Sequence, residues 1–230
     1  MANKYYDILR APHQVAFDIT NNCNLRCLHC FNSSGENDVI SNELSDGEVL
    51  HFIEDLASMN LYNVCFCGGE TLLRKELMCE CIKILKPSGS HCTAVTNGLL
   101  ANPATIQQLA SAGLDGIQFS LDGLRDSHER LRNKVGIFPK VIDAMKYVLN
   151  ETGLRLSIAF TPTSFNVKDF LGVYDLLVDL YEKSNRTTGS DYIDFRLQPL
   201  MLLGRAKDNP NIVPSDAQYR CLVQNINEVN

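Results

Sequence analysis

Three cysteines near the start of the sequence have the spacing of a metal site. Cys23, Cys27 and Cys30 are separated by three and then two residues, within residues 18–31. Thiolates bind soft metals, and a short loop with this spacing can direct three sulfur atoms at one centre. Zinc and an iron-sulfur cluster are the two candidate metals, and buried cysteines without any metal are the third interpretation.

The need for a fourth ligand distinguishes the two metals. Structural zinc requires four protein ligands, and His29 cannot easily complete the set because it lies between Cys27 and Cys30. A four-iron cluster held by three cysteines leaves one iron open to an external ligand. The iron-sulfur interpretation therefore predicts a reactive centre, whereas zinc predicts a closed structural site.

Composition limits the classes to which this protein can belong. Its 230 residues are 45% hydrophobic, enough for one folded domain, and its formal charge is -6. This balance, without a long Lys/Arg run, argues against partners such as nucleic acid or a membrane surface. No apolar stretch approaches the ~20 residues of a membrane span, and no signal peptide is recognisable. We expect a cytoplasmic protein whose nine cysteines are thiols or metal ligands.

The hydrophobic pattern predicts strands and helices in alternation, with the cysteine segment between the first strand and the first helix. The predicted strands cover residues 13–20, 63–67, 91–97, 116–122, 155–163 and 191–200. The predicted helices cover residues 46–60, 75–86, 103–112, 140–150 and 166–181, with a last helix after Pro214. Alternation of this kind is typical of a parallel sheet with right-handed crossovers.

Local signals position several helix ends. Ser45 and Glu48 form a capping box, which starts the first helix. Asn102 and the proline after it open the third helix, and Gly113 ends it. Asn166 is expected to cap the helix after the fifth strand, and residues 123–139 are expected to form a polar loop.

Polar residues on one side of the predicted strands favour a barrel over a flat sheet. A sheet with helices on both faces would have strands that are apolar throughout. The polar residues of the fourth and sixth strands are Gln118, Ser120, Asp122, Asp194, Arg196 and Gln198. We therefore expect an α/β fold, a partial (β/α)6 barrel of parallel strands whose helices lie outside and whose polar side chains line the interior. By the same rule Cys65, Cys67 and Cys92 should point inward, with Ala94 and Thr96.

Three features together resemble the radical S-adenosylmethionine (radical SAM) enzymes. They are the cysteine spacing after the first strand, the sequence Gly68-Gly69-Glu70 after the second, and the sixfold strand-helix alternation. The resemblance covers essentially the whole chain, and it weakens the zinc interpretation, since a structural site explains neither the glycines nor the polar interior. It implies a 4Fe-4S cluster on the three cysteines, with S-adenosyl-L-methionine (SAM) on the open iron. Reductive cleavage of SAM would give a 5′-deoxyadenosyl radical that abstracts hydrogen from a substrate.

The resemblance also implies which residues contact SAM. Gly68 and Gly69 would let the backbone approach the methionyl group, and Glu70 would accept a hydrogen bond from its amine. His29 stands where the family usually has an aromatic residue beside the adenine, which is a departure from the pattern. Thr96 and Asn97 match the end of the family's third strand. Ordinary turns are the alternative explanation for these glycines and for the Asn97-Gly98 pair.

The middle of the sequence resembles one subgroup, the SPASM-type maturases that modify ribosomally made peptides and protein side chains. The resemblance implies that Ser120, Asp122 and Arg132 lie near SAM, whereas a solvated charge is the ordinary alternative for Arg132. Arg196 inside a barrel needs a counter-charge, and Asp194 is the nearest candidate. The two form either a structural pair or a clamp for a substrate carboxylate. No residue is assigned as a catalytic acid, base or nucleophile.

Many members of this subgroup continue into a cysteine-rich extension with auxiliary clusters, and here the C-terminal region contains only Cys221. We expect residues 1–230 to form a single radical SAM core domain without that extension. The expected partners are a peptide or protein substrate and an external one-electron donor of the flavodoxin or ferredoxin type. The alternatives are a radical SAM enzyme of small-molecule cofactor biosynthesis and a metal-bound binding module without turnover.

Overall fold

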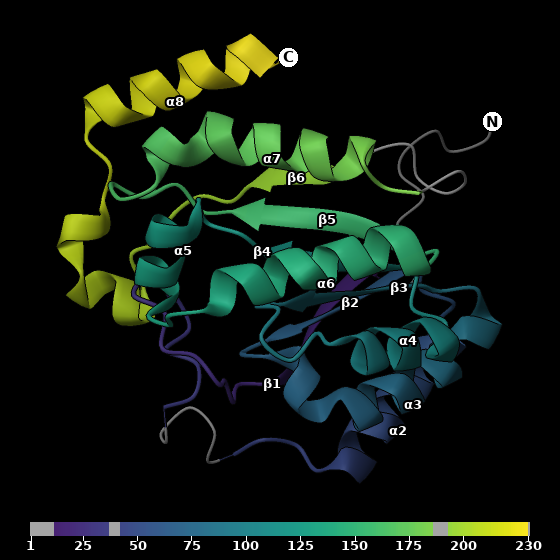
Figure 1. The fold of residues 1–230 in the computed structure, drawn as a ribbon. Coiled ribbons are helices and arrows are strands. Elements are labelled where there is room, and N and C mark those ends of the chain that lie inside the picture. Colours follow the sequence, from purple (N-terminus) through teal and green to yellow (C-terminus); the bar gives the residue numbers. More distant parts are fainter. Residues whose placement is uncertain (1–11, 37–41, 186–192, 230) are drawn as a thin grey trace, which may run out of the picture.

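Six parallel strands form a single sheet in the computed structural model, which describes residues 12–36, 42–185 and 193–229 (Figure 1). The strands lie side by side in chain order, from β1 to β6. Their bounds are β1 Gln14–Thr20, β2 Asn63–Gly68, β3 His91–Thr96, β4 Gly116–Ser120, β5 Arg155–Phe160 and β6 Asp194–Leu197. Since β1 and β6 are the edges of this sheet within the described residues, the predicted partial (β/α)6 barrel is confirmed.

Helices connect the strands and pack along the outside of the sheet (Figure 1). Successive helices contact one another, α2 with α3, α3 with α4 and α4 with α6. The α-helices are α2 Asp46–Ser58, α3 Lys75–Leu85, α4 Pro103–Ala112, α5 Arg125–Arg132, α6 Ile137–Glu151, α7 Phe170–Glu182 and α8 Asp216–Val229. The short 3-10 helices are η1 Thr71–Arg74, η2 Lys86–Ser88, η3 Val167–Asp169, η4 Gly204–Asp208 and η5 Pro210–Ile212. No helix in the described part of the chain combines the length and hydrophobicity that a membrane span needs.

The predicted helix ends are confirmed where a side chain caps the backbone. Ser45 and Glu48 form the capping box at the start of α2. The Asn102 side chain accepts a hydrogen bond from the backbone of Thr105, and Gly113 ends α4 in the left-handed conformation. These caps satisfy backbone groups that the helix itself leaves unpaired.

The polar loop predicted for residues 123–139 is wrong, because α5 and the start of α6 lie there. Charged residues dominate α5, so it lacks a broad apolar stripe. Its stable face consists of Ser127, His128 and Leu131, which are buried against the rest of the protein, and Asn133 ends it in the left-handed conformation. Tertiary contacts therefore form this helix where hydrophobic periodicity gives no signal.

The two faces of the sheet differ in polarity, as the sequence predicts. Val64, Phe66, Ile117 and Phe119 lie on the helix-covered face and are at most 1% exposed. The opposite face encloses a polar cavity of about 270 Å³, which we call the lumen cavity. Its lining includes Cys65, Thr93, Gln118, Ser157, Asp194 and Arg196.

The inward direction predicted for Cys92 is wrong. In the parallel pairing of β2 with β3, Cys65 lies beside Thr93, whereas Cys92 lies beside Val64 on the helix-covered face. Cys92 is fully buried there. Small residues occupy both faces of β3, so alternation alone does not show which face points into the barrel.

Several strands are shorter than predicted. β4 ends at Ser120 and β5 at Phe160, so that Asp122 and Thr161 lie in the loops beyond the carboxyl ends of these strands. The described part of the sixth strand is Asp194–Leu197, and the predicted positions 191 and 192 lie outside the described residues. These loops at the carboxyl ends contain the candidate site.

Candidate active site

A cavity of about 460 Å³ lies at the carboxyl ends of the strands. We call it the cysteine cavity, because Cys23, Cys27 and Cys30 all line it. The other predicted site residues on its wall are His29, Gly68, Gly69, Thr96, Asn97, Ser120 and Arg132. Glu70 and Asp122 do not line it but are buried against wall residues. The structure thus brings together residues that lie more than a hundred positions apart in the sequence.

The cysteine loop, residues 21–31, follows β1 and places the three thiols on the cavity wall. Cys27 is buried and Cys23 and Cys30 are half-buried, and none of them forms a disulfide. The backbone amide of Leu28 donates to the carbonyl of Leu131 at 2.9 Å, which joins the loop to the end of α5. Burial raises the pKa of the Cys27 thiol to about 11, although the nearby Arg132 charge opposes this shift.

Gly68, the last residue of β2, and Gly69 after it pack closely against the backbone where the cysteine loop begins. A Cβ atom on Gly68 would lie 2.2 Å from the carbonyl oxygen of Thr20, and one on Gly69 would lie 2.2 Å from that of Asn22. Gly68 also has a φ of +129°, which side chains of L-residues rarely adopt. The amide of Gly69 donates to the carbonyl of Thr20 at 2.8 Å. Close backbone packing therefore requires both glycines, and their predicted contact with a methionyl group stays a prediction.

Glu70 connects the glycine turn to the end of β3. One carboxylate oxygen accepts the Thr96 hydroxyl at 2.7 Å, and the other accepts the Asn97 amide at 2.8 Å. Burial raises the pKa of Glu70, and these hydrogen bonds oppose the shift. The structure thus gives Glu70 a bracing role, and its predicted bond to a bound amine stays a prediction.

The Asn97 side chain joins the end of β3 to the cysteine loop. Its Nδ2 donates to Oδ1 of Asn24 at 2.8 Å and lies 4.0 Å from the Cys23 sulfur. Asn97 itself lines the cavity. The Ser120 hydroxyl lies at the end of β4 on the same wall. The strand ends predicted to form a site therefore meet at one cavity.

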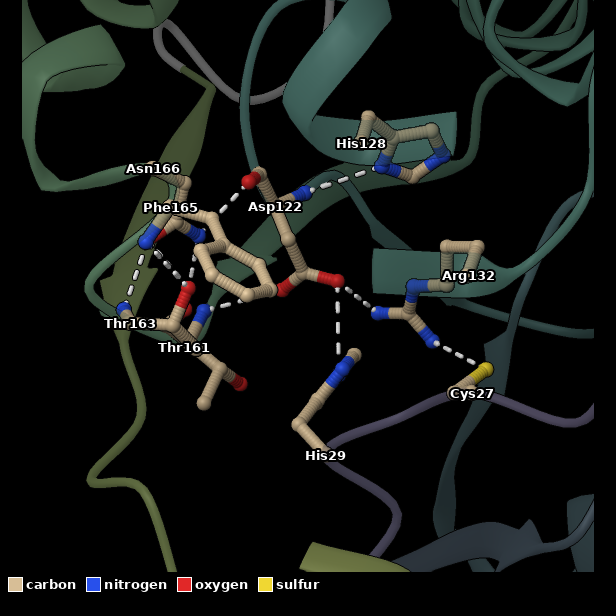
Figure 2. Close-up of polar contacts among 9 residues, drawn as sticks. All are labelled: Cys27, His29, Asp122, His128, Arg132, Thr161, Thr163, Phe165 and Asn166. Atoms are coloured by element: carbon tan, nitrogen blue, oxygen red, sulfur yellow. Dashed lines mark hydrogen bonds and ion pairs between the residues drawn. The ribbon is translucent and has the colours of Figure 1, made fainter. Parts of the chain in front are cut away.

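Asp122 lies between α5 and the cysteine loop, and Figure 2 shows its carboxylate directed at Arg132 and His29. One carboxylate oxygen lies 2.5 Å from Nη2 of Arg132 and 3.4 Å from Nε2 of His29. The other oxygen accepts the backbone amide of Thr161 at 2.9 Å. Burial raises the pKa of Asp122, but opposing effects, led by the Arg132 charge and including the hydrogen bond from Thr161, outweigh burial and hold that pKa below its ordinary value. The carboxylate is therefore ionised and paired.

Arg132 is not a solvated charge, which was the alternative while it was predicted to lie in a loop; it is the last residue of α5. Its side chain is 11% exposed, and its Nη1 donates to the Cys27 sulfur at 3.8 Å (Figure 2). Burial lowers the pKa of Arg132, but Asp122 and Cys27 outweigh burial and raise that pKa above its ordinary value. The guanidinium therefore connects the buried carboxylate to the cysteine loop.

Two histidines beside this ion pair are neutral at pH 7. Burial lowers the pKa of His29 to about 4, against the opposing effect of Asp122, and burial lowers that of His128 to about 3. His128 Nδ1 accepts the backbone amide of Asp122 at 3.1 Å. The Nδ1 atom of His29 is buried and has no partner in the protein. His29 thus presents an unpaired polar atom beside the cavity.

Two residues outside the predicted site, Asn166 and Arg205, support Asp122 and the cysteine loop. Asn166 was predicted as a helix cap, but it makes no cap hydrogen bond. Its Nδ2 instead donates to the carbonyls of Asp122 and Thr161, at 2.6 and 2.9 Å (Figure 2). Arg205 donates from Nε to the carbonyl of Cys27 at 3.2 Å. The resemblance at Gly204-Arg205-Ala206 was a signal for this segment, although it did not indicate the contact.

The predicted pair of Asp194 and Arg196 is present, but it lies in the lumen cavity. Nε of Arg196 donates to Oδ2 of Asp194 at 2.6 Å. Both residues line the lumen cavity rather than the cysteine cavity, and the two cavities share Val95 on their walls. The pair is therefore separate from the three cysteines.

Comparison with known proteins extends the resemblance. The model of the radical SAM superfamily matches residues 17–177. The chain is 32% identical over 163 residues to Fe-coproporphyrin III synthase of Methanosarcina barkeri, covering 71% of this chain and 40% of that protein. It is 29% identical over 184 residues to the mycofactocin maturase MftC of Mycolicibacterium smegmatis, covering 78% of this chain and 45% of that protein. The chain thus spans about half the length of the curated relatives it matches.

A solved structure agrees on the fold. SuiB of Streptococcus suis, determined with SAM bound, superposes with a TM-score of 0.71 over 95% of this chain and 47% of that one. The sequences are 19% identical, so this likeness concerns the fold alone. The family model covers well over half of the chain. The chain therefore belongs to the radical SAM superfamily of enzymes, and the cofactors of that family are a 4Fe-4S cluster and SAM.

Proposed function

We propose that this chain holds the 4Fe-4S cluster on Cys23, Cys27 and Cys30 and binds SAM in the cysteine cavity. One observation carries the proposal: the three thiols line a cavity whose wall residues include buried polar atoms without a partner in the protein. These atoms are Nδ1 of His29 and Nε of Arg132. Because buried polar atoms are normally hydrogen-bonded, a polar ligand in this cavity would satisfy them.

We propose a cluster rather than a single metal ion as the group that the three thiols hold. Among the described residues, no three His, Cys, Asp or Glu side chains converge closely enough to share one ion. A cubane spreads its irons over several corners, so its cysteine ligands stand further apart than those of one ion. Three cysteines also leave one iron for the amine and carboxylate of SAM.

The residues around the cavity have distinct tasks in this proposal. Gly68 and Gly69 present bare backbone to the methionyl group, and Glu70 holds the end of β3 beside it. Asn97 and Ser120 offer polar groups at the strand ends. The flat His29 ring would lie against the adenine, with its unpaired Nδ1 available as an acceptor.

Bound together, the two cofactors supply a 5′-deoxyadenosyl radical that abstracts a hydrogen atom from a substrate. The chain's own contribution is orientation and the exclusion of water. The buried pair of Asp122 and Arg132 supports both, since it fixes the end of α5 against Cys27. We assign no side chain as the base or nucleophile of a later step.

We propose a peptide or protein as the substrate. Support comes from relatives such as MftC and the Bacillus subtilis sporulation killing factor maturation protein SkfB, which is 26% identical over 164 residues. The lumen cavity adjoins the cysteine cavity at Val95 and contains polar groups that suit a peptide backbone. Co-expression with short candidate peptides, followed by mass spectrometry, tests this choice through a change in peptide mass.

A small-molecule substrate is the second candidate. The 32% identity to Fe-coproporphyrin III synthase favours it, because that relative is named for a tetrapyrrole product. Calorimetry with peptides and with iron coproporphyrin, on the protein loaded with its cluster, separates the two candidates. Tight binding of the porphyrin and none of any peptide would replace the first candidate by the second.

Anoxic reconstitution with iron and sulfide tests the activity itself. The wild-type chain should show cluster absorbance and, with dithionite and SAM, should release 5′-deoxyadenosine. Cys27→Ala should lose both, whereas the matched variant Cys92→Ala removes an equally buried thiol on the far side of β3 and should keep both. A folded wild-type protein that shows neither signal would contradict the proposal.

Three further expectations belong to the proposal. We propose that the chain folds as one core domain, that a flavodoxin or ferredoxin supplies the electron, and that the protein works in the cytoplasm. The single sheet supports one core domain, and the cysteines without disulfides support the cytoplasm. Limited proteolysis, reduction by purified donors and cell fractionation are the corresponding measurements.

A further inference from the structure

The ion pair between Asp122 and Arg132 is unusual in its position beside a cysteine sulfur. The Asp122 side chain is fully buried, and that of Arg132 is 11% exposed. From the same guanidinium, Nη2 lies 2.5 Å from the carboxylate and Nη1 donates to the Cys27 sulfur at 3.8 Å (Figure 2). A structural ion pair does not require the second contact, which instead places a positive charge beside the sulfur.

The charge at this place comes from these two residues. His29 and His128 also face Asp122, but their ring nitrogens are directed at that residue and not at the sulfur: Nε2 of His29 lies 3.4 Å from the Asp122 carboxylate, and Nδ1 of His128 accepts the Asp122 amide at 3.1 Å. Arg26 and Arg205 also lie near the cysteine loop, but their guanidinium groups bond to backbone carbonyls rather than to sulfur. Nη1 of Arg26 donates to the Cys23 carbonyl at 2.8 Å. Nε of Arg205 donates to the Cys27 carbonyl at 3.2 Å, and its Nη1 pairs with Glu36 at 2.6 Å. The charge that reaches the Cys27 sulfur is therefore that of Arg132, reduced by that of Asp122.

A positive N-H group beside a cluster thiolate favours reduction. The reduction potential of an iron-sulfur cluster depends on net charge, on hydrogen bonds to its sulfurs and on solvent exposure. Reduction adds one electron and breaks no bond, the electron coming from an external one-electron donor. A nearby cation stabilises the added charge, and a nearby anion opposes it, most strongly where water is excluded.

We propose that the Arg132–Asp122 pair sets the reduction potential of the cluster through Cys27, Arg132 raising the potential and Asp122 limiting the rise. The inference rests on the proposed function, because it requires Cys27 as a cluster ligand. Arg132 and Asp122 are positioning residues in this account. They act on the cluster through the sulfur and touch no reacting atom.

Substitutions of the two partners should shift the potential in opposite directions. Arg132→Gln removes the positive charge, so the equilibrium constant for reduction should fall about tenfold or more, and tenfold corresponds to about 59 mV for one electron. Asp122→Asn keeps an oxygen for the Thr161 amide but removes the negative charge, so the potential should rise. A merely structural role for the pair would shift both variants in the same direction or neither.

The experiment is a redox titration followed by electron paramagnetic resonance, on reconstituted protein without SAM. Omitting SAM separates this effect from any contact between Arg132 and the cofactor. Lys86 and Asp115 form a partly exposed ion pair, 2.7 Å apart, at the opposite end of the sheet, where Asp115 directly precedes β4. Lys86→Gln and Asp115→Asn make the same charge changes there and should leave the potential unchanged.

Arg132→Lys keeps the result decisive even if Asp122→Asn does not fold. It retains the charge, so its potential should stay closer to that of the wild type than the potential of Arg132→Gln. Equal potentials in wild type, Arg132→Lys and Arg132→Gln would overturn the inference while leaving the proposed function intact. Absence of any cluster signal in the wild type would instead overturn the proposed function.

Discussion

Two of the Asp-Arg pairs in the described part of this protein differ in what surrounds them. Asp122 and Arg132 lie at the carboxyl end of the sheet, where the pair is almost completely buried and contacts the cysteine loop. Asp194 and Arg196 lie in the lumen cavity, with 35% and 57% of their side chains exposed. Water screens the second pair and not the first. Removal of one partner therefore leaves a buried charge unpaired in the first pair, but only a solvated charge in the second.

The surrounding backbone follows the same division. At the carboxyl end, the glycine turn, the end of β3, α5 and Arg205 all bond to the cysteine loop or its flanks. At the lumen cavity, hydrogen bonds among the described residues join neighbouring strands, as from the Ser157 hydroxyl to Asp194 at 3.3 Å. We infer that the carboxyl end is preorganised, whereas the lumen can adapt to what it contains.

The largest expected difference in stability is between the two aspartates. Asp122→Ala leaves the Arg132 charge buried without its partner, and should lower the free energy of unfolding by about 3–5 kcal/mol. Asp194→Ala should lower it by about 0–1 kcal/mol, because both partners are substantially exposed. Urea denaturation of the metal-free proteins measures both. Equal losses would break the comparison.

The glycines provide the next contrast. Gly69→Ala places a methyl group against the Asn22 carbonyl and should cost about 1–3 kcal/mol, with a lower yield of reconstituted cluster. Gly153, in the loop before β5, has open space around its Cα and is the control. Gly153→Ala should change stability by less than about 0.5 kcal/mol. If Gly69→Ala had wild-type stability and cluster yield, the glycine turn would not position the cysteine loop.

A smaller contrast concerns hydroxyl groups. Thr96→Val removes one hydrogen bond from the buried Glu70 carboxylate and should cost about 1.5 kcal/mol. Ser157→Ala removes a longer bond, 3.3 Å, to the half-exposed Asp194, and should cost about 0.5 kcal/mol. Thermal unfolding of the two variants in parallel decides the order. The reverse order would show that the lumen is the more rigid region.

The last prediction concerns the reactivity of thiols and not the stability of the fold. The Sγ atoms of Cys65 and Cys67 lie 3.5 Å apart, and the hydrogen bond between them lowers the pKa of Cys65 to about 6. Burial raises the pKa of Cys92 to about 12. A thiolate is the reactive form, so iodoacetamide should alkylate the pair of Cys65 and Cys67 at a lower pH than it alkylates Cys92. Mass spectrometry should find Cys92 unmodified up to pH 8, and modification of Cys92 and the pair alike would contradict the assignment of faces.

The sequence predicts the elements of this fold well and some of their faces poorly. The capping box at Ser45 and the glycine at Gly113 are local signals, and both mark helix ends correctly. The face of β3 was predicted wrongly, because small residues on both sides of a strand make its orientation ambiguous. Helix α5 was missed, because its buried side consists of a few residues that only tertiary contacts identify.

The same limit applies to the site. Cysteine spacing indicates a metal centre because its ligands are close in sequence. The contact of Arg132 with Cys27 joins residues 105 positions apart, and that of Arg205 joins residues 178 positions apart. No local pattern encodes such contacts. The bracing role of Glu70 likewise depends on the pairing of β2 with β3, which the sequence around Glu70 does not show.

The most direct test of the central claim is the electron paramagnetic resonance spectrum of the reduced, reconstituted protein, recorded with and without SAM. A cluster on Cys23, Cys27 and Cys30 with one open iron should give about four irons per chain and a spectrum that changes when SAM is added. One zinc and no iron per chain, or a cluster signal that persists in Cys27→Ala and does not respond to SAM, would contradict it.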